Sequence, residues 1–144
     1  MSLFYDIHGN LPKGVYQLRL EEIRAEFGST NSQREWLMHQ LNSLLALAQK
    51  SNKLKRFFVW GSFASQKPFP KDLDVLLVFS ADFADDDLSE EIISMLDHEQ
   101  ARMRYQADVF WVRESMAPEA LELLLDTYQK DRQHRDRGIV EIVL

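Results

Sequence analysis

Two aspartates, Asp72 and Asp74, stand at the start of an otherwise apolar run that ends at Phe79. Aspartate is a poor strand residue, so two of them at the entry to a predicted β-strand call for an explanation. Side chains at i and i+2 of a strand point to the same face, which predicts that the two carboxylates lie side by side. Neighbouring carboxylates repel one another unless a cation lies between them, and Mg²⁺ is the usual cation for oxygen ligands shared with phosphates. The pattern therefore predicts a metal-binding pair.

A second candidate feature, Gly61 followed by Ser62, comes directly after a short β-prone apolar run, residues 57–60. Glycine lets a ligand approach the backbone closely, and the amides that follow it, with a serine hydroxyl, can receive a phosphate. Lys67 in the same connection could reach a triphosphate as a point charge, or could be an ordinary lysine exposed in a turn. A phosphate-binding turn before a metal-binding carboxylate pair indicates a nucleoside triphosphate as the ligand.

At these residues the chain resembles the DNA-polymerase-β-like nucleotidyltransferase superfamily. The signature of that superfamily is an apolar strand, Gly-Ser, a spacer and then Asp-x-Asp set among apolar residues. The family pattern adds a third carboxylate on a later strand, and Asp108, within the apolar run 105–112, fits that position. More loosely, the chain looks like the small stand-alone bacterial and phage members, the minimal nucleotidyltransferases. The resemblance covers about residues 35–115.

The resemblance implies an α/β (α+β) nucleotidyltransferase-like fold and a nucleotidyl transfer reaction. An acceptor oxygen attacks the α-phosphate of a nucleoside triphosphate, and pyrophosphate leaves. Asp72 and Asp74 would hold two Mg²⁺ ions, with Mn²⁺ as a second candidate, and Asp108 would complete the metal site at the acceptor oxygen and help to deprotonate it. The triphosphate contacts would come from Gly61, Ser62 and Lys67. The acceptors implied are a protein side chain or an RNA end, in a toxin–antitoxin setting in which either a partner toxin or tRNA is modified.

The same residues also admit a purely structural interpretation. The aspartate pair is then a solvated strand entry, Gly61 is a plain turn glycine and Ser62 caps a helix. At the level of function, the alternative is a non-catalytic binding module that keeps the fold and acts through a protein partner or as an oligomer. The N-terminal arm and the final strand are candidates for pairing with another chain, because an uncovered edge strand is a ready template.

Composition sets the outer limits of these interpretations. The chain has 144 residues, of which 45% are hydrophobic and 28% charged, which predicts one folded domain. It has no cysteine, which excludes disulfides and thiolate metal sites. No apolar run approaches the roughly 18 residues of a membrane helix, and no signal segment precedes the domain, so a cytoplasmic protein is expected.

The net charge of −6 counts against tight, nonspecific nucleic-acid binding, which normally uses a basic surface. The basic residues within 50–56 and 130–137 could line an RNA acceptor track. Acidic and polar residues interrupt both runs, which favours an ordinary solvated surface.

Periodicity and turn residues predict a single domain over residues 1–144, with a mixed β-sheet and helices packed mainly on one side. The capping-box pair Ser32 and Glu35 predicts a helix that begins at Ser32 and buries an apolar stripe including Trp36. A later helix is expected to turn Ile93 inward. The predicted parts are an extended N-terminal arm (1–17), a helical lead-in (18–50), a catalytic core (55–115) and a C-terminal helix and strand (118–144). Helices are expected at 18–27, 32–50, 87–102 and 118–128, and strands at 57–60, 72–79, 105–112 and 139–144.

Overall fold

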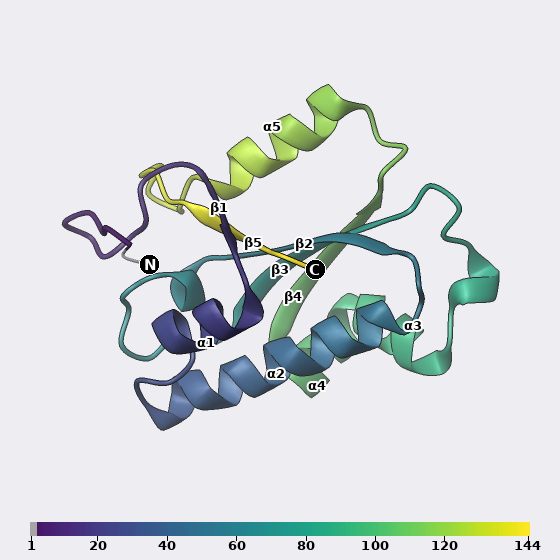
Figure 1. The fold of residues 1–144 in the computed structure, drawn as a ribbon, viewed down its shortest axis with the longest axis horizontal. Coiled ribbons are helices and arrows are strands. Elements are labelled where there is room, and N and C mark those ends of the chain that lie inside the picture. The colour runs from purple at the N-terminus through teal and green to yellow at the C-terminus, as the bar shows by residue number, and fades with distance from the viewer. Residues whose placement is uncertain (1–2) are drawn as a thin grey trace.

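The apolar run that follows Asp72 forms β3 (Leu73–Phe79), which lies inside a five-stranded mixed sheet (Figure 1). The computed structural model describes residues 3–144, and within that range the sheet has the order β1-β5-β2-β3-β4. Apart from Asp74, every residue of β3 is buried. The other strands are β1 (Val15–Leu18), β2 (Leu54–Trp60), β4 (Ala107–Arg113) and β5 (Ile139–Ile142). The helices are α1 (Leu20–Phe27), α2 (Ser32–Gln49), α3 (Glu90–Leu96), α4 (His98–Tyr105) and α5 (Pro118–Tyr128).

Strand directions bring the loops of interest to one end of the sheet. β2 runs antiparallel to both β3 and β5, whereas β3 and β4 are parallel, as are β1 and β5. The end of β2 therefore lies beside the beginnings of β3, β4, β5 and β1. In Figure 1 this is the end of the sheet where α2 begins and α5 finishes. Segments far apart in the sequence, before β1, after β2, before β3 and before β5, consequently meet there.

Both faces of the sheet are covered, which explains why β3 is apolar on both sides. α1, α2, α3 and α4 pack on one face, where the large core includes Phe27, Leu41 and Met95. Among the helices of residues 3–144, α5 covers the other face, over a smaller core that includes Trp60 and Leu76. Burying a large apolar side chain contributes about 1.5–3 kcal/mol, so the two cores stabilise the sheet from both faces. The predicted mixed α/β domain with helices mainly on one side is confirmed.

The N-terminal part departs from the sequence prediction in three respects. The predicted extended arm contains β1, which pairs in parallel with β5, so the two segments offered for pairing with a partner pair with each other. The capping residue of α2 is Asn31 rather than Ser32, because the Asn31 side chain accepts a hydrogen bond from the Arg34 amide. Trp36 lies outside the buried stripe and is 42% exposed.

The helix predicted over 87–102 is two helices, α3 and α4, separated at Asp97. Asp97 has an extended backbone, and its side chain accepts the Gln100 amide and so caps a new helix. Ile93 turns outward with 49% exposure, whereas Ile92 is buried. α4 continues to Tyr105, so the third core strand begins two residues later than predicted, at Ala107. None of the helices within residues 3–144 is long and apolar enough to cross a membrane.

Candidate functional site

The carboxylate of Asp74 lies directly over the turn formed by Gly61. Asp74 pairs with Trp60 across β2 and β3, so the residue that follows Trp60 faces it at the sheet end. Gly61 has a φ of 82° and a ψ of −155°, a backbone conformation that is essentially restricted to glycine. A Cβ atom at Gly61 would lie 2.5 Å from Asp74 Oδ2. The sequence therefore needs glycine at this position both for the backbone angle and for the approach of the carboxylate.

The third predicted carboxylate, Asp108, stands beside Asp74 on the neighbouring strand. The two residues are register partners in the parallel β3–β4 ladder. Asp72 lies just before β3, near the same end. Arg102, from α4, lies between these acids: its Nη1 atom is 2.6 Å from Asp108 Oδ1 and its Nη2 atom is 3.6 Å from Asp72 Oδ2. The structure therefore places a guanidinium between two of the three carboxylates.

The surroundings of Asp74 oppose its ionisation. Burial, followed by the negative charges of Asp72 and Asp108, raises the pKa of Asp74 from 3.8 to about 6. Arg137 and Arg102 act in the opposite direction but do not compensate. Binding of a cation to Asp74 would be electrostatically favourable, because the cation would offset the repulsion from Asp72 and Asp108 and neutralise the buried carboxylate.

The donor set suits a hard divalent cation, although the acids are not gathered around one point. Three carboxylates supply only oxygen donors, as Mg²⁺ prefers. Within residues 3–144, no group of three acidic or histidine side chains is gathered closely enough to hold a metal ion. Asp108 is engaged with Arg102 instead. Binding a metal through Asp72, Asp74 and Asp108 would require Arg102 to move aside.

One cleft contains all six of the residues predicted for the site. Its volume is about 430 Å³. Basic side chains from other parts of the chain join them there, so the cleft is lined by cations as well as acids. The lining residues are Gly61, Ser62, Lys67, Lys71, Asp72, Asp74, Asp108, Asp131, Arg132, Gln133, Arg135 and Arg137.

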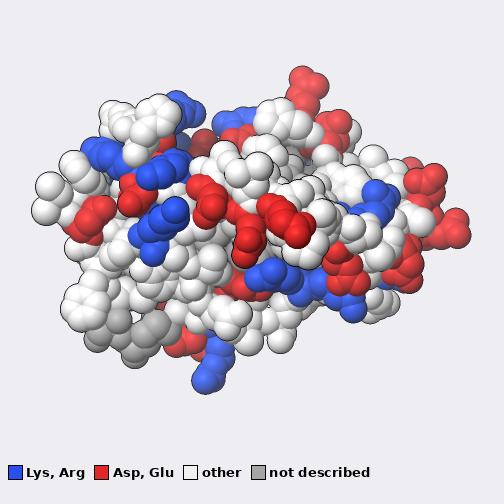
Figure 2. Space-filling view, turned by 90° about the horizontal axis from the view of Figure 1, so that it is seen from above, with Lys and Arg blue, Asp and Glu red and all other residues white. Residues whose placement is uncertain are grey.

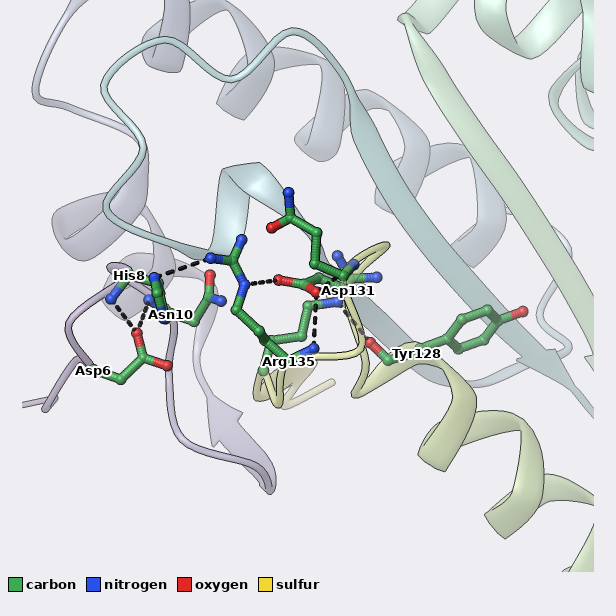
Figure 3. Close-up of polar contacts among 8 residues, drawn as sticks. Asp6, His8, Asn10, Tyr128, Asp131 and Arg135 are labelled. Atoms are coloured by element: carbon green, nitrogen blue, oxygen red, sulfur yellow. Dashed lines mark hydrogen bonds and ion pairs between the residues drawn. The ribbon is translucent and has the colours of Figure 1, made fainter.

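The basic part of the cleft comes mainly from the loop that connects α5 and β5. Asp131 organises this loop, because its carboxylate accepts the amides of Gln133 and Arg135 and binds Arg135 Nε at 2.9 Å (Figure 3). Arg137 is half-buried and donates from Nε to the Tyr128 carbonyl at 2.8 Å. Burial lowers the pKa of Arg137, and the charge of Asp74 raises it, which places the two side chains within electrostatic reach.

The N-terminal turn adds a further wall to the basic part. Asp6 accepts the amides of His8 and Asn10, and His8 Nδ1 lies 3.0 Å from Arg135 Nη1 (Figure 3). The Gln66 amide donates to the Gly9 carbonyl at 2.9 Å, which fixes the turn to the loop after Gly61. A second hollow of about 450 Å³ results, lined by residues of this turn together with Gly61, Ser62, Lys67 and the 131–137 loop.

Several residues in the cleft or beside it were missed by sequence reasoning. Arg135 and Arg137 were considered only as surface or RNA-binding residues, and Arg102 and His8 were not assigned to the site. No local sequence pattern identifies them, because the order and directions of the strands bring their segments to this end of the sheet. Arg102 lies near the end of α4, and Arg135 and Arg137 lie just before β5, at the same end of the sheet, whereas His8 lies in the segment that precedes β1.

Several side chains of the two basic runs are paired with acidic residues. Arg56 donates to both carboxylate oxygens of Glu141, and Lys53 lies 2.6 Å from Asp82. In the other run, Lys130 pairs with Asp136. On the face shown in Figure 2, acidic and basic side chains are interspersed, without a broad basic area among the described residues. The interpretation as a mostly solvated, paired surface is favoured.

Comparison with known proteins identifies the family but not an activity. The model of DUF6932, a family of unknown function, matches residues 3–143, and the chain belongs to that family. No curated protein and no solved structure matched the chain.

Proposed function

We propose that this member of the DUF6932 family is a Mg²⁺-dependent nucleotidyltransferase with the fold of the DNA-polymerase-β-like superfamily. It transfers a nucleoside monophosphate from a nucleoside triphosphate to a protein side chain or an RNA end, and a toxin–antitoxin pair is one setting for that activity. The observation that supports this most is the contact of Asp74 with Gly61, next to Asp72 and Asp108, in a cleft that also holds several cations.

The residues that line the cleft form two groups. The basic group suits the phosphates of the triphosphate, and the acidic group suits the metal ions and the acceptor oxygen. Gly61 and Ser62 lie where the two groups meet, because they line both hollows. Lys67, Arg135 and Arg137 also line both, and their charges would neutralise the phosphates of the triphosphate. The three acids lie on the other side. The α-phosphate would therefore lie above Gly61, with the β- and γ-phosphates toward the basic hollow.

Transfer needs a proton acceptor and a departing pyrophosphate. The acceptor O–H loses its proton, its oxygen bonds to the α-phosphorus, and the bond from the α-phosphorus to the bridging oxygen breaks. Asp108, once released from its ion pair with Arg102, would take that proton. Lys67 and Arg135 would hold the pyrophosphate. Bound Mg²⁺ would supply further neutralisation of the phosphates and activation of the acceptor oxygen.

The direct test is transfer of label from the four nucleoside triphosphates, each labelled on the α-phosphate. The protein is incubated with Mg²⁺ and either bacterial total RNA or bacterial soluble protein. We expect label on one acceptor class, lost in Asp74→Asn and kept in Glu122→Gln, an exposed carboxylate of α5. Label that persists in Asp74→Asn would contradict the proposed role of Asp74.

The ion pairs of Arg102 favour a second candidate, a binding module without catalysis. A guanidinium that permanently satisfies Asp72 and Asp108 would leave no vacant position for a metal ion. In that case Mn²⁺, used as a spectroscopic substitute for Mg²⁺, should not bind the wild-type protein, whereas it should bind Arg102→Gln, in which both carboxylates are free of the guanidinium. Saturable binding to the wild-type protein would exclude this candidate.

A further inference from the structure

Arg34, near the start of α2, is a buried side chain that the predicted site did not include. It is 4% exposed, and its guanidinium points at the loop that follows Gly61. Nη1 donates to the carbonyl of Phe63 at 2.8 Å, and Nη2 donates to the carbonyl of Ser65 at 2.7 Å. Nη2 also donates to the Lys67 carbonyl and lies 3.4 Å from the Ser62 carbonyl.

The environment of this guanidinium is unusual for a buried charge. No acidic side chain within residues 3–144 forms an ion pair with Arg34. Burial lowers its pKa, and its donors are met by main-chain carbonyls, including that of Phe27 at 3.0 Å. A buried cation costs stability unless it is hydrogen-bonded, and a neutral side chain would avoid most of that cost. Packing alone therefore does not explain why an arginine, and not a neutral side chain, occupies this buried position.

The loop held by Arg34 is the one that would receive phosphate. Residues 65–72 form no helix or strand, so their backbone carbonyls depend on partners from elsewhere. Two neighbours on α2 and its cap support the same segment: Asn31 Nδ2 donates to the Pro68 carbonyl at 2.7 Å and Gln33 Nε2 to the Pro70 carbonyl at 2.9 Å. The beginning of α2 thus anchors the whole connection between Gly61 and β3.

We propose that Arg34 is a positioning residue that fixes the loop from Ser62 to Lys67 in the conformation that binds the triphosphate. By gathering the carbonyl oxygens of the loop on one side, the guanidinium leaves the opposite side of the loop, with the Ser62 side chain, facing the cleft. Its planar set of donors reaches several carbonyls at once, which the ammonium group of lysine cannot do in the same geometry. This inference rests on the proposed function, because it takes the loop to be the segment that binds the phosphates of the triphosphate.

The test compares Arg34→Gln and Arg34→Lys with the wild-type protein and with Arg24→Gln, an exposed arginine on α1. Amide hydrogen exchange reports the order of the loop, through the bonded amides of Ala64, Gln66 and Lys67. Binding of a nonhydrolysable ATP or GTP analogue with Mg²⁺ reports the phosphate site. Mn²⁺ binding to the carboxylates serves as the internal control, since the ion pairs of Asp72 and Asp108 involve Arg102 and not Arg34.

We expect exchange at residues 62–67 to accelerate at least tenfold in Arg34→Gln, with strands β2 and β3 unchanged. Nucleotide affinity should fall at least tenfold in both Arg34 variants, whereas Mn²⁺ affinity and the Arg24→Gln protein should stay within about threefold of the wild type. Arg34→Lys retains the charge, so it is the variant that keeps the test available if Arg34→Gln does not fold.

Two results would overturn the inference. One is unchanged loop exchange and unchanged nucleotide affinity in a folded Arg34 variant. The other is an acceleration of exchange spread equally over β2, β3 and the loop, which would make Arg34 a general core residue. A wild-type protein that binds no nucleotide would instead overturn the proposed function, and the exchange pattern alone would then decide whether Arg34 anchors the loop.

Discussion

Asp74 combines three properties that separate it from an ordinary strand residue. It is the one polar side chain in β3, it touches the turn at Gly61, and it lies beside two other acids. The pattern Asp-x-Asp predicted the pair with Asp72. The contact with Gly61 could not be predicted, because it depends on the register between β2 and β3.

The raised pKa of Asp74 leads to a pH-dependent stability. The folded protein holds a proton on Asp74 up to a pH of about 6, whereas the unfolded chain loses it near 3.8. The stabilising contribution of the protonated form is therefore complete below about pH 4 and is lost as the pH rises through 6. At pH 8 without metal, Asp74→Asn should be more stable than the wild type by on the order of 1–3 kcal/mol.

Urea unfolding in EDTA at pH 4, 6 and 8 measures this difference in the free energy of unfolding. The advantage of Asp74→Asn should shrink as the pH falls toward 4. Added Mg²⁺ should stabilise the wild type and not the variant. A variant that is less stable than the wild type at pH 8, or a difference in stability that does not change with pH, would show that folding does not raise the pKa of Asp74.

Arg102 makes a second prediction at the residue scale. Its guanidinium competes with any metal ion for Asp72 and Asp108. Exposed ion pairs contribute about 0.2–1 kcal/mol, so removing Arg102 should strengthen Mn²⁺ binding by at most about fivefold. Electron paramagnetic resonance of free Mn²⁺ measures the affinity for Arg102→Gln, with the exposed neighbour Arg104→Gln as the control. Weaker binding in Arg102→Gln than in Arg104→Gln would mean that Arg102 supports the site and does not compete for it.

At the scale of the elements, the conformation of the turn after β2 depends on one residue, Gly61. Gly61→Ala combines a positive φ with a contact of 2.5 Å to Asp74, so we expect a loss of about 1–3 kcal/mol and displacement of the carboxylate. Gly9→Ala is the matched control, because Gly9 also has a positive φ, of 78°, but the nearest atom to its added Cβ would be Gln66 Cβ, at 3.2 Å.

Both glycine variants should therefore lower the melting temperature, and only Gly61→Ala should weaken Mn²⁺ binding. Calorimetry and Mn²⁺ titration measure the two effects separately. Equal Mn²⁺ affinity in the two variants would contradict the view that the missing side chain of Gly61 leaves the space in which the Asp74 carboxylate binds the metal.

Elements with long, regular patterns were predicted well, and short or interrupted ones were not. α2 and α5 agree closely with prediction, since an apolar stripe and Pro118 mark them. β1 has four residues, too few for a period of two to stand out, and its pairing with β5 joins the two ends of the chain. The break between α3 and α4 depends on the local cap at Asp97, which competes with an otherwise continuous helical pattern.

At the scale of the whole molecule, the arrangement of strands decides which residues share the cleft. The sequence predicted Asp72, Asp74, the Gly61 turn and Lys67, because these lie close together along the chain, and it predicted Asp108 through the family pattern. Arg135 in the cleft and His8 in the adjoining hollow could not be predicted as their neighbours, since the pairing of β5 with β2 and β1 brings them to this end of the sheet. Despite a net charge of −6, the cleft receives enough cations to suit a triphosphate.

The most direct measurement of the central claim is the melting temperature with each of the four ribonucleoside triphosphates, with and without Mg²⁺. At about 100 times its dissociation constant, a ligand adds roughly 2.7 kcal/mol, which corresponds to a rise of roughly 5–10 °C for a chain of this size. We predict a rise that requires both Mg²⁺ and a triphosphate, is absent in Asp72→Asn and Asp74→Asn, and is kept in Glu122→Gln. A wild-type protein that shows no Mg²⁺-dependent rise with any of the four nucleotides would contradict the proposed triphosphate site.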